Sequence, residues 1–481
     1  MAQYFDERFG NNSGYYLVSA TEKQVPIPKD KPKRLIIILV DGLRFDEAKK
    51  LNSIKKFKCS IIDVSPLSMS RPVYTTLSTG VEQDRTGVRN NANELPKNGI
   101  AIESIWEVAR KNNLEVSLIS ELTWWKELFP NGFADYKTLP IDKNYFENIE
   151  LKDITLIHPL YIDEDSHSYG LNSSQYTDSV KRLNLELDKF IDKIDIVNDL
   201  IIFTADHGHV LVGGHGGWEE GLTKVPACFL GKGVNLQKEN TILSVRLLSP
   251  IISIVMGIPI PKNARIDENE IEEIFNLLDE KVYGKEYISN RKSNLEKFSS
   301  DIIAALGENW TQLYSRQTAV NYTKFIALLF LFSFLNFKLN HYTNVSYTYK
   351  NYIYIFLFLF ILVTTYIFLR GNFSITSVNT REKFLSFYFP FTAIMIFSGN
   401  LINYLVNRSL QTILMNSFLL SQILFIILST HLFAFGIRIG FPLPLPELLF
   451  LPLFSSILGI FNSIFYLIVL LIEVATAKFF K

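Results

Sequence analysis

The stretch LIIFTADHGHVLVGGHGG, residues 200–217, decides the fold and points to its chemistry. It opens with a short apolar run of the kind that forms a fully buried strand. Asp206 and His207 follow that run directly, and a glycine-rich turn then brings in His209 and His215. An Asp–His pair alone is common at helix caps and in cores. The metal-site interpretation therefore depends on whether other parts of the chain supply further ligands.

Similar short apolar runs recur along the first half of the chain. They lie at 35–40, 60–64, 115–119, 154–157, 200–204 and 227–230. Helix-periodic segments, notably 102–111 and 173–193, separate some of them. This alternation predicts a doubly wound, mostly parallel α/β sheet. Ligands of such sheets bind outside the carboxyl ends of the strands, where Asp206 and His207 fall.

Two candidate residues follow the first two runs. Asp41, in VDGLR, ends the first run and could equally be an ordinary turn residue before Gly42. The segment SRPVYTTLSTG begins at Ser70, and Pro72 suits the first turn of a helix. Ser70 could be a simple cap. Alternatively it is a nucleophile, because the positive end of a helix dipole and a nearby cation both lower the pKa of a hydroxyl.

A third candidate segment, HPLYIDEDSHSYG, follows the run at 154–157. Asp163 and His167 are four residues apart, so one turn of helix or a tight loop would let them converge on a cation. Acidic loops are usually only solvated, and the nearby His158 and Asp165 are alternatives within the same segment.

Taken in order, VDGLR, SRPVYTTLSTG, DEDSH and ADHGH with a following HGG resemble the alkaline phosphatase superfamily. The likeness is greatest to the type I phosphodiesterase/nucleotide pyrophosphatase branch and its membrane-bound relatives, the GPI ethanolamine phosphate transferases. It covers roughly residues 35–257 and implies a sheet of alkaline-phosphatase type.

The resemblance implies a role for each matching residue. One metal would be held by Asp41, Asp206, His207 and the nucleophile Ser70, and a second by Asp163, His167 and His215. Asn91, in GVRNN, would contact the transferred phosphoryl oxygen. His209 is expected to be a neighbour rather than a ligand. His215 follows His207 more closely than the last metal histidine does in the soluble phosphodiesterases.

The chemistry that these residues suit is in-line displacement at phosphorus. Two divalent cations roughly 4 Å apart can activate the attacking oxygen and stabilise the leaving one. Carboxylate and imidazole ligands without thiolates favour Zn²⁺, with Mn²⁺ as the alternative. We expect a covalent phosphoserine at Ser70, followed by transfer to water or to an acceptor hydroxyl. Arg44 and Arg71 adjoin the site residues and could bind phosphate oxygens, or be surface charges.

Three other functions are weighed against this one. A sulfatase would carry a C/S-x-P-x-R motif, and residues 70–74 read SRPVY without the final Arg. A phosphoglycerate mutase-like enzyme needs a large inserted domain, for which the roughly 80 residues after Ser70 leave little room. A catalytically inactive scaffold or binding protein would keep the fold but need no intact ligand set.

The last third of the chain differs in charge and hydropathy. From residue 321 onward there are ten Lys or Arg and three Glu, against 38 basic and 45 acidic residues before it. Residues 352–369 form an uncharged run long enough to span a membrane. Further candidates are 325–337, 384–406, 410–437 and 448–465. We predict about five transmembrane helices, or six if the last region is a hairpin.

The predicted organisation has four parts. A polar segment at 1–34 precedes a catalytic domain at 35–264, a charged helical linker at 265–320 and the transmembrane domain at 321–481. Cys59 and Cys228 are the only cysteines and indicate neither a disulfide framework nor a cysteine metal motif.

The side of the membrane stays open from the sequence. The polar start favours the cytoplasm, whereas the resemblance favours the extracellular or lumenal side. The expected partners are a phosphodiester or phospholipid-type substrate and the lipid bilayer, with no nucleic acid polymer.

Overall fold

The structure is a computed structural model that describes residues 18–22, 25–64, 68–88, 91, 98–217, 219–235 and 242–305. The chain divides into two compact units, Met1–Leu313 and Tyr314–Lys481, and every described residue belongs to the first. The predicted transmembrane segments lie outside the described residues. Among the helices that are described, none is both long and apolar enough to cross a membrane.

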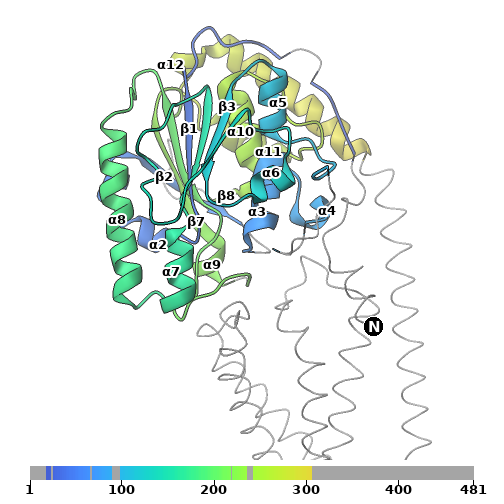
Figure 1. Cartoon of the computed structure of the whole chain (residues 1–481). Helices are drawn as coiled ribbons and strands as arrows, with labels where there is room; N and C mark the ends of the chain where they lie inside the picture. Colours follow the sequence, from blue (N-terminus) through green and yellow to red (C-terminus); the bar gives the residue numbers. More distant parts are fainter. Residues whose placement is uncertain are drawn as a thin grey trace, which may run out of the picture. The chain divides into compact units, whose positions relative to one another are not determined.

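An eight-stranded sheet forms the centre of the first unit (Figure 1). The strands are β1 (Leu35–Val40), β2 (Lys58–Asp63), β3 (Val116–Ser120), β4 (Asp135–Thr138), β5 (Ile154–His158), β6 (Leu200–Ala205), β7 (Lys224–Gly231) and β8 (Ile242–Ser244). Their order is β4-β3-β5-β1-β6-β7-β2-β8. β7 pairs antiparallel with β6 and β2, and the other pairs are parallel. The predicted mostly parallel α/β sheet is confirmed.

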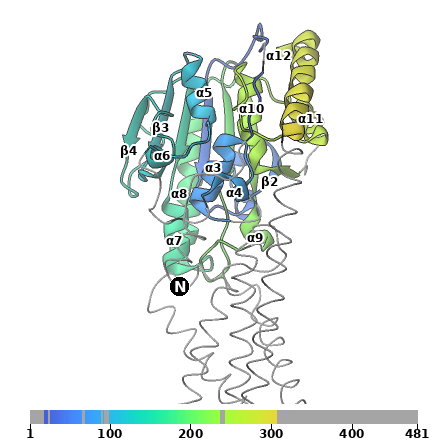
Figure 2. The same cartoon turned by 90° about the vertical axis from the view of Figure 1, so that its right-hand side faces the viewer.

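Helices cover both faces of the sheet. They are α2 (Phe45–Ala48), η1 (Ser53–Lys56), α3 (Ser70–Thr79), α4 (Gln83–Thr86), α5 (Ile105–Lys111), α6 (Trp124–Leu128), α7 (Tyr161–Tyr169), α8 (Ser174–Ile191), α9 (Glu220–Thr223), η2 (Val245–Leu247), α10 (Leu248–Met256), α11 (Glu268–Phe275), α12 (Glu280–Tyr283) and a helical stretch at 285–305. α2 and α8 lie on one face, and α3, α5 and α10 lie on the other (Figures 1 and 2). The sheet is therefore doubly wound, as its central strands, buried on both sides, require.

The segment predicted as a linker, 265–320, is described as far as residue 305. In that part Leu295, Phe298 and Ile302 are buried in the same apolar core as the sheet. The Arg291 side chain is also fully buried, where its guanidinium forms an ion pair with Glu22 at 3.1 Å. Residues 265–305 are thus an integral layer of the first unit.

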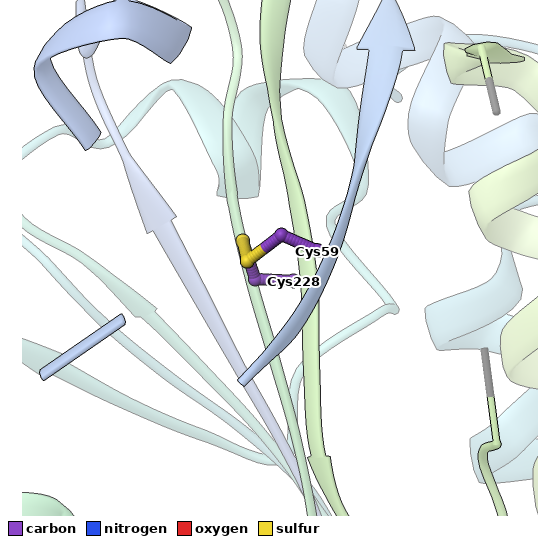
Figure 3. The surroundings of a disulfide bond; sticks show 2 residues. All are labelled: Cys59 and Cys228. Atoms are coloured by element: carbon purple, nitrogen blue, oxygen red, sulfur yellow. A yellow bond between two sulfur atoms is a disulfide. The ribbon is translucent and has the colours of Figure 1, made fainter. Parts of the chain in front are cut away.

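The two cysteines form a disulfide across neighbouring strands (Figure 3). Cys59 on β2 is in register with Cys228 on β7, and their Cα atoms are 4.0 Å apart. The two cysteines, whose number and spacing predict no disulfide framework, thus form a single disulfide. The pairing depends on β7 running antiparallel beside β2, a feature that a cysteine count and spacing do not reveal.

The sheet register places the candidate residues together. Val40 at the end of β1 is paired with Ala205 at the end of β6, so Asp41 and Asp206 emerge side by side. β5 lies on the other side of β1 and ends at His158. The carboxyl ends of three adjacent strands therefore bring polar side chains to one place.

Candidate metal centre

Four residues gather at the ends of β1 and β6 and at the start of α3. We call Asp41, Ser70, Asp206 and His207 the inner cluster. The His207 Nε2 atom lies 3.5 Å from Asp41 Oδ1, 3.2 Å from Asp206 Oδ2 and 3.2 Å from Ser70 Oγ. All four side chains are buried. The Gly42 backbone N–H donates to Asp206 Oδ1, which leaves Oδ2 of that carboxylate facing the histidine.

Two carboxylate oxygens of the inner cluster accept no hydrogen bond from the residues that the structure describes. Within the described part of the chain, Asp41 Oδ1 and Asp206 Oδ2 are buried and accept no hydrogen bond. A buried carboxylate oxygen without a donor is costly, because it has lost its water and gained nothing in return. Both oxygens face His207 Nε2, so one divalent cation between the three atoms would satisfy them together. The inner cluster therefore fits a metal ion.

Ser70 is the first residue of α3, where the helix dipole is positive. Asn91 supports it: the amide Nδ2 donates to Ser70 Oγ at 3.4 Å, and Oδ1 accepts from the Arg71 backbone N–H at 3.0 Å. The helix start, Asn91 and His207 thus hold the hydroxyl beside the inner-cluster carboxylates. This placement suits a nucleophile.

A second group adjoins the first, and we call Asp163, His167, His209 and His215 the outer cluster. Asp163 and His167 lie on one turn of α7, and the two other histidines lie on the glycine-rich loop after β6. Asp163 Oδ1 is 2.7 Å from His209 Nε2, 3.5 Å from His167 Nε2 and 3.8 Å from His215 Nε2. The side chains of Asp163 and His167 retain about a fifth of their exposure, at 21% and 18%.

The loop reaches α7 because it lacks side chains at its turn. Gly213 has φ +86°, and a Cβ there would lie 2.1 Å from the Ser166 carbonyl oxygen. Gly213 is therefore needed for this close approach as well as for its positive φ. The approach also stacks the His215 ring on His207, with centroids 3.7 Å apart, so the two clusters are contiguous.

The hydrogen bonds of His215 and His209 assign opposite tautomers to their rings. His215 Nδ1 is 2.7 Å from the Ser68 carbonyl oxygen, which only accepts, so Nδ1 carries the proton and Nε2 has the lone pair. The Gly214 backbone N–H donates to His209 Nδ1 at 2.9 Å, which places the His209 proton on Nε2, facing Asp163. His215 thus offers a ligand atom to the outer cluster, whereas His209 donates a hydrogen bond to its carboxylate.

The pKa values of the buried aspartates and histidines indicate that the site lacks positive charge. Burial and the charge of Asp41 raise the pKa of Asp163 and Asp206 well above the usual range. Burial lowers the pKa of His207 and His215 well below the ordinary value, so that both rings stay neutral. Bound divalent cations would allow the carboxylates to ionise and would use the histidine lone pairs.

The structure brings seven predicted residues into the two clusters, and Asn91 lies against Ser70. The two predicted phosphate-binding arginines have protein partners. Arg71 pairs with Glu127 at 2.5 Å and stacks over the Trp124 ring. Arg44 pairs with Asp46 and donates to the His209 carbonyl oxygen at 2.9 Å, so it supports the loop.

Sequence reasoning missed two contacts of Asp41. Tyr74 donates to Asp41 Oδ2 at 2.6 Å, and His158 Nε2 lies 3.3 Å from the same oxygen. Burial alone would raise the pKa of Asp41, but these two side chains lower it overall. The available signals were the position of His158 at the end of a buried strand and the single helical turn between Ser70 and Tyr74.

Fold and site together define an α/β protein with a two-part carboxylate–imidazole centre and a helix-start serine at one edge of its sheet. Residues 117–326 match the family model described as type I phosphodiesterase / nucleotide pyrophosphatase. The resemblance predicted from the four motifs is confirmed: the chain is similar to this family and to GPI ethanolamine phosphate transferases.

Two relatives illustrate the match in sequence. GPI ethanolamine phosphate transferase 1 of Yarrowia lipolytica is 36% identical over 258 residues, which cover 42% of this chain and 27% of the relative. GPI ethanolamine phosphate transferase 2 of Saccharomyces cerevisiae is 22% identical over 298 residues, covering 50% of this chain and 35% of the relative. The matched part thus spans only about a quarter to a third of these relatives.

Solved structures that resemble about half of this chain were also found. Human ectonucleotide pyrophosphatase / phosphodiesterase 5 has a TM-score of 0.41 at 11% identity and covers 51% of this chain and 100% of its own. The C-terminal periplasmic domain of EcEptC from Escherichia coli has a TM-score of 0.35 at 10% identity, with 51% and 89% covered.

Proposed function

We propose that this chain is a membrane-anchored, two-metal phosphotransferase or phosphodiesterase that acts on a lipid-linked phosphodiester, with phosphoethanolamine as the favoured transferred group. The observation that carries the proposal is the inner cluster. There Ser70 Oγ lies 3.2 Å from His207 Nε2, beside two buried carboxylate oxygens without a described donor. The similarity to GPI ethanolamine phosphate transferases supports the choice of transferred group.

The proposed metal ligands follow from the two clusters. Asp41, Asp206, His207 and Ser70 would hold one ion, and Asp163, His167 and His215 would hold the other. The ligands are oxygen and nitrogen atoms, which suits Zn²⁺ or Mn²⁺. When bound, the cations supply charge stabilisation and lower the pKa of nearby hydroxyls.

The reaction has two displacements at phosphorus. Ser70 Oγ loses its proton and bonds to phosphorus, while the bond from phosphorus to the first alcohol breaks and that alcohol leaves with a proton. The oxygen of an acceptor hydroxyl or of water then bonds to phosphorus, the bond from phosphorus to Ser70 Oγ breaks, and the proton lost by the attacking group passes to Ser70 Oγ. Asn91, whose amide Nδ2 donates to Ser70 Oγ at 3.4 Å, would hold this oxygen for attack and would donate to an oxygen of the phosphoryl group.

Replacement of the nucleophile tests the proposal. We expect Ser70→Ala to lower the hydrolysis of bis-nitrophenyl phosphate by more than about 1000-fold, because the covalent route is lost. Metal content, measured by elemental analysis, should stay near the wild-type value because three inner-cluster ligands remain. Ser174→Ala, an exposed serine at the start of α8, is the matched control. Undiminished turnover in Ser70→Ala would exclude Ser70 as the nucleophile.

We also propose that the first unit works on the lumenal or extracellular side of the membrane. The support is the Cys59–Cys228 disulfide, since disulfides persist in oxidising compartments and are rare in the cytosol. Denatured protein from cells quenched with acid should react with a maleimide at two thiols only after reduction. Reaction before reduction would contradict this orientation.

A further inference from the structure

Behind Asp41, on the side away from His207, lies a layer of buried polar and aromatic side chains that the proposed reaction does not use. It contains Tyr74 from α3 and His158 from the end of β5, both completely buried. Tyr74 donates to Asp41 Oδ2 at 2.6 Å, and His158 Nε2 lies 3.1 Å from the tyrosine oxygen. The Tyr74 hydroxyl, His158 Nε2 and Asp41 Oδ2 are therefore all close to one another.

The tautomer of His158 follows from its other neighbours. The indole Nε1 of Trp125, which can only donate, lies 3.2 Å from His158 Nδ1. Nδ1 must therefore accept, and the proton of the neutral ring sits on Nε2. Ser120 Oγ, at 3.1 Å from Nδ1, can donate to the same atom. The Nε2–H group then faces Asp41 Oδ2, 3.3 Å away.

Aromatic packing holds this arrangement in place. The rings of Trp125 and Tyr74 are stacked, with centroids 4.4 Å apart and planes inclined by 16°. Trp106 packs edge-on against Trp125, and its own Nε1 donates to Ser78 Oγ at 2.8 Å. Because these rings are buried and closely packed, neither Tyr74 nor His158 can turn away from Asp41 without disturbing the core.

These contacts fix the orientation of the Asp41 carboxylate. Its Oδ2 accepts a hydrogen bond from Tyr74 and lies 3.3 Å from His158 Nε2, whereas its Oδ1 is buried, accepts nothing from the described residues and faces His207 Nε2 at 3.5 Å. A carboxylate free to rotate would exchange the two oxygens. Here the exchange would break the hydrogen bond from Tyr74 and the contact with His158.

We propose that Tyr74 and His158 are positioning residues that hold the Asp41 carboxylate with Oδ1 directed at the inner-cluster cation. The inference rests on the proposed two-metal function. The inference assigns part of the metal affinity to two residues that are not themselves metal ligands. Partners of this kind typically account for a 10- to 100-fold difference in affinity, roughly.

The experiment measures metal binding directly on the full-length chain, stripped of metal and titrated with Zn²⁺ against a competing chelator. Tyr74→Phe is the principal variant, because it removes one oxygen and keeps the stacked ring. We expect this variant to lower the affinity for one of the two ions by about 10-fold or more. Tyr283→Phe is the matched control, since Tyr283 is also buried and its hydroxyl donates to a backbone carbonyl, that of Val255, at 3.2 Å.

A double-mutant cycle separates positioning from simple packing. In an Asp41→Asn background, Tyr74→Phe should change Zn²⁺ affinity little, because there is no charged carboxylate left to orient. His158→Gln, which keeps a donor near the Nε2 position, should retain more affinity than His158→Leu.

The outcomes distinguish this inference from the proposed function. If the wild type binds Zn²⁺ and Tyr74→Phe binds it equally tightly, with only its thermal midpoint lowered, Tyr74 is a core residue and the positioning role is refuted. An equal loss with and without the Asp41 carboxylate refutes it as well. If the wild type binds neither Zn²⁺ nor Mn²⁺, the two-metal function fails, and the inference fails with it.

Discussion

The inner and outer clusters share residue types but differ in how the fold builds them. The inner-cluster aspartates are the residues that directly follow two strands in register, β1 and β6, so the sheet itself places them. The outer cluster joins one turn of α7 to a loop that depends on glycines to approach it. The sheet thus positions the inner cluster, whereas a helix and a loop position the outer cluster.

The two clusters also differ in what remains unsatisfied. Asp41 and Asp206 each keep a buried oxygen without a described donor, whereas the corresponding oxygen of Asp163 already accepts from His209 at 2.7 Å. The inner cluster is closed to solvent, and the outer one is partly exposed. We therefore expect the inner ion to be bound more tightly and to matter more for activation of Ser70. Because Asp163 and His167 keep some solvent exposure, we expect ions to enter from the side of the outer cluster.

The largest effect that tests this difference comes from a matched pair of substitutions, Asp206→Asn and Asp163→Asn. Each should remove one ion. Asp206→Asn should lower turnover by about 1000-fold or more, because the lost ion adjoins the nucleophile. Asp163→Asn should lower it by roughly 100-fold or less, since Asp163 contacts the three outer-cluster histidines while Ser70 contacts His207 and Asn91.

Elemental analysis and phosphodiester turnover measure both effects, and Asp178→Asn on the exposed face of α8 is the control. Timed chelation of the wild type adds a second readout, in which the outer ion should leave first. Equal losses in the two variants, together with a single chelation phase, would show that the clusters act as one unit.

The sequence predicted the parts of the fold that depend on local pattern. The continuous apolar runs identified β1 and β6 because a strand buried on both faces has no polar alternation. β4 was missed: Asp135–Thr138 is a polar edge strand whose pairing is decided by β3. The disulfide was missed for a similar reason, because the antiparallel placement of β7 is a property of the whole sheet.

The same distinction applies to the site. Residues in the four motifs were identified because a strand end or a helix start places them at the carboxyl edge of any such sheet. The contacts behind them were not predicted, because nothing local in the sequence places Tyr74, or His158, the alternative within its segment, against Asp41. The roles of Arg44 and Arg71 likewise depend on partners far away in the chain, such as the His209 carbonyl and Glu127.

The smallest expected effect concerns His209. Its position among ligand-capable atoms suggests a metal ligand, whereas its hydrogen bonds do not. The ligand-capable atoms of Asp163, His167 and His209 lie within 4.8 Å of one another, as a ligand set would. The Gly214 N–H, however, occupies the Nδ1 lone pair, and the Nε2 proton points at Asp163. His209 is therefore a hydrogen-bond donor to a ligand, as His158 is to Asp41.

Two substitutions in the same loop discriminate between the roles. His215→Gln should remove the outer ion, because Nε2 of His215 is oriented as a ligand by the Ser68 carbonyl. His209→Gln keeps a side-chain donor and should leave two ions per chain, with the affinity of the outer one lowered by about 10-fold. The measurement is Zn²⁺ stoichiometry and affinity by competitive titration. A stoichiometry of one in His209→Gln would mean that the ring sheds its Nε2 proton and binds the ion, and the outer cluster would then have four protein ligands instead of three.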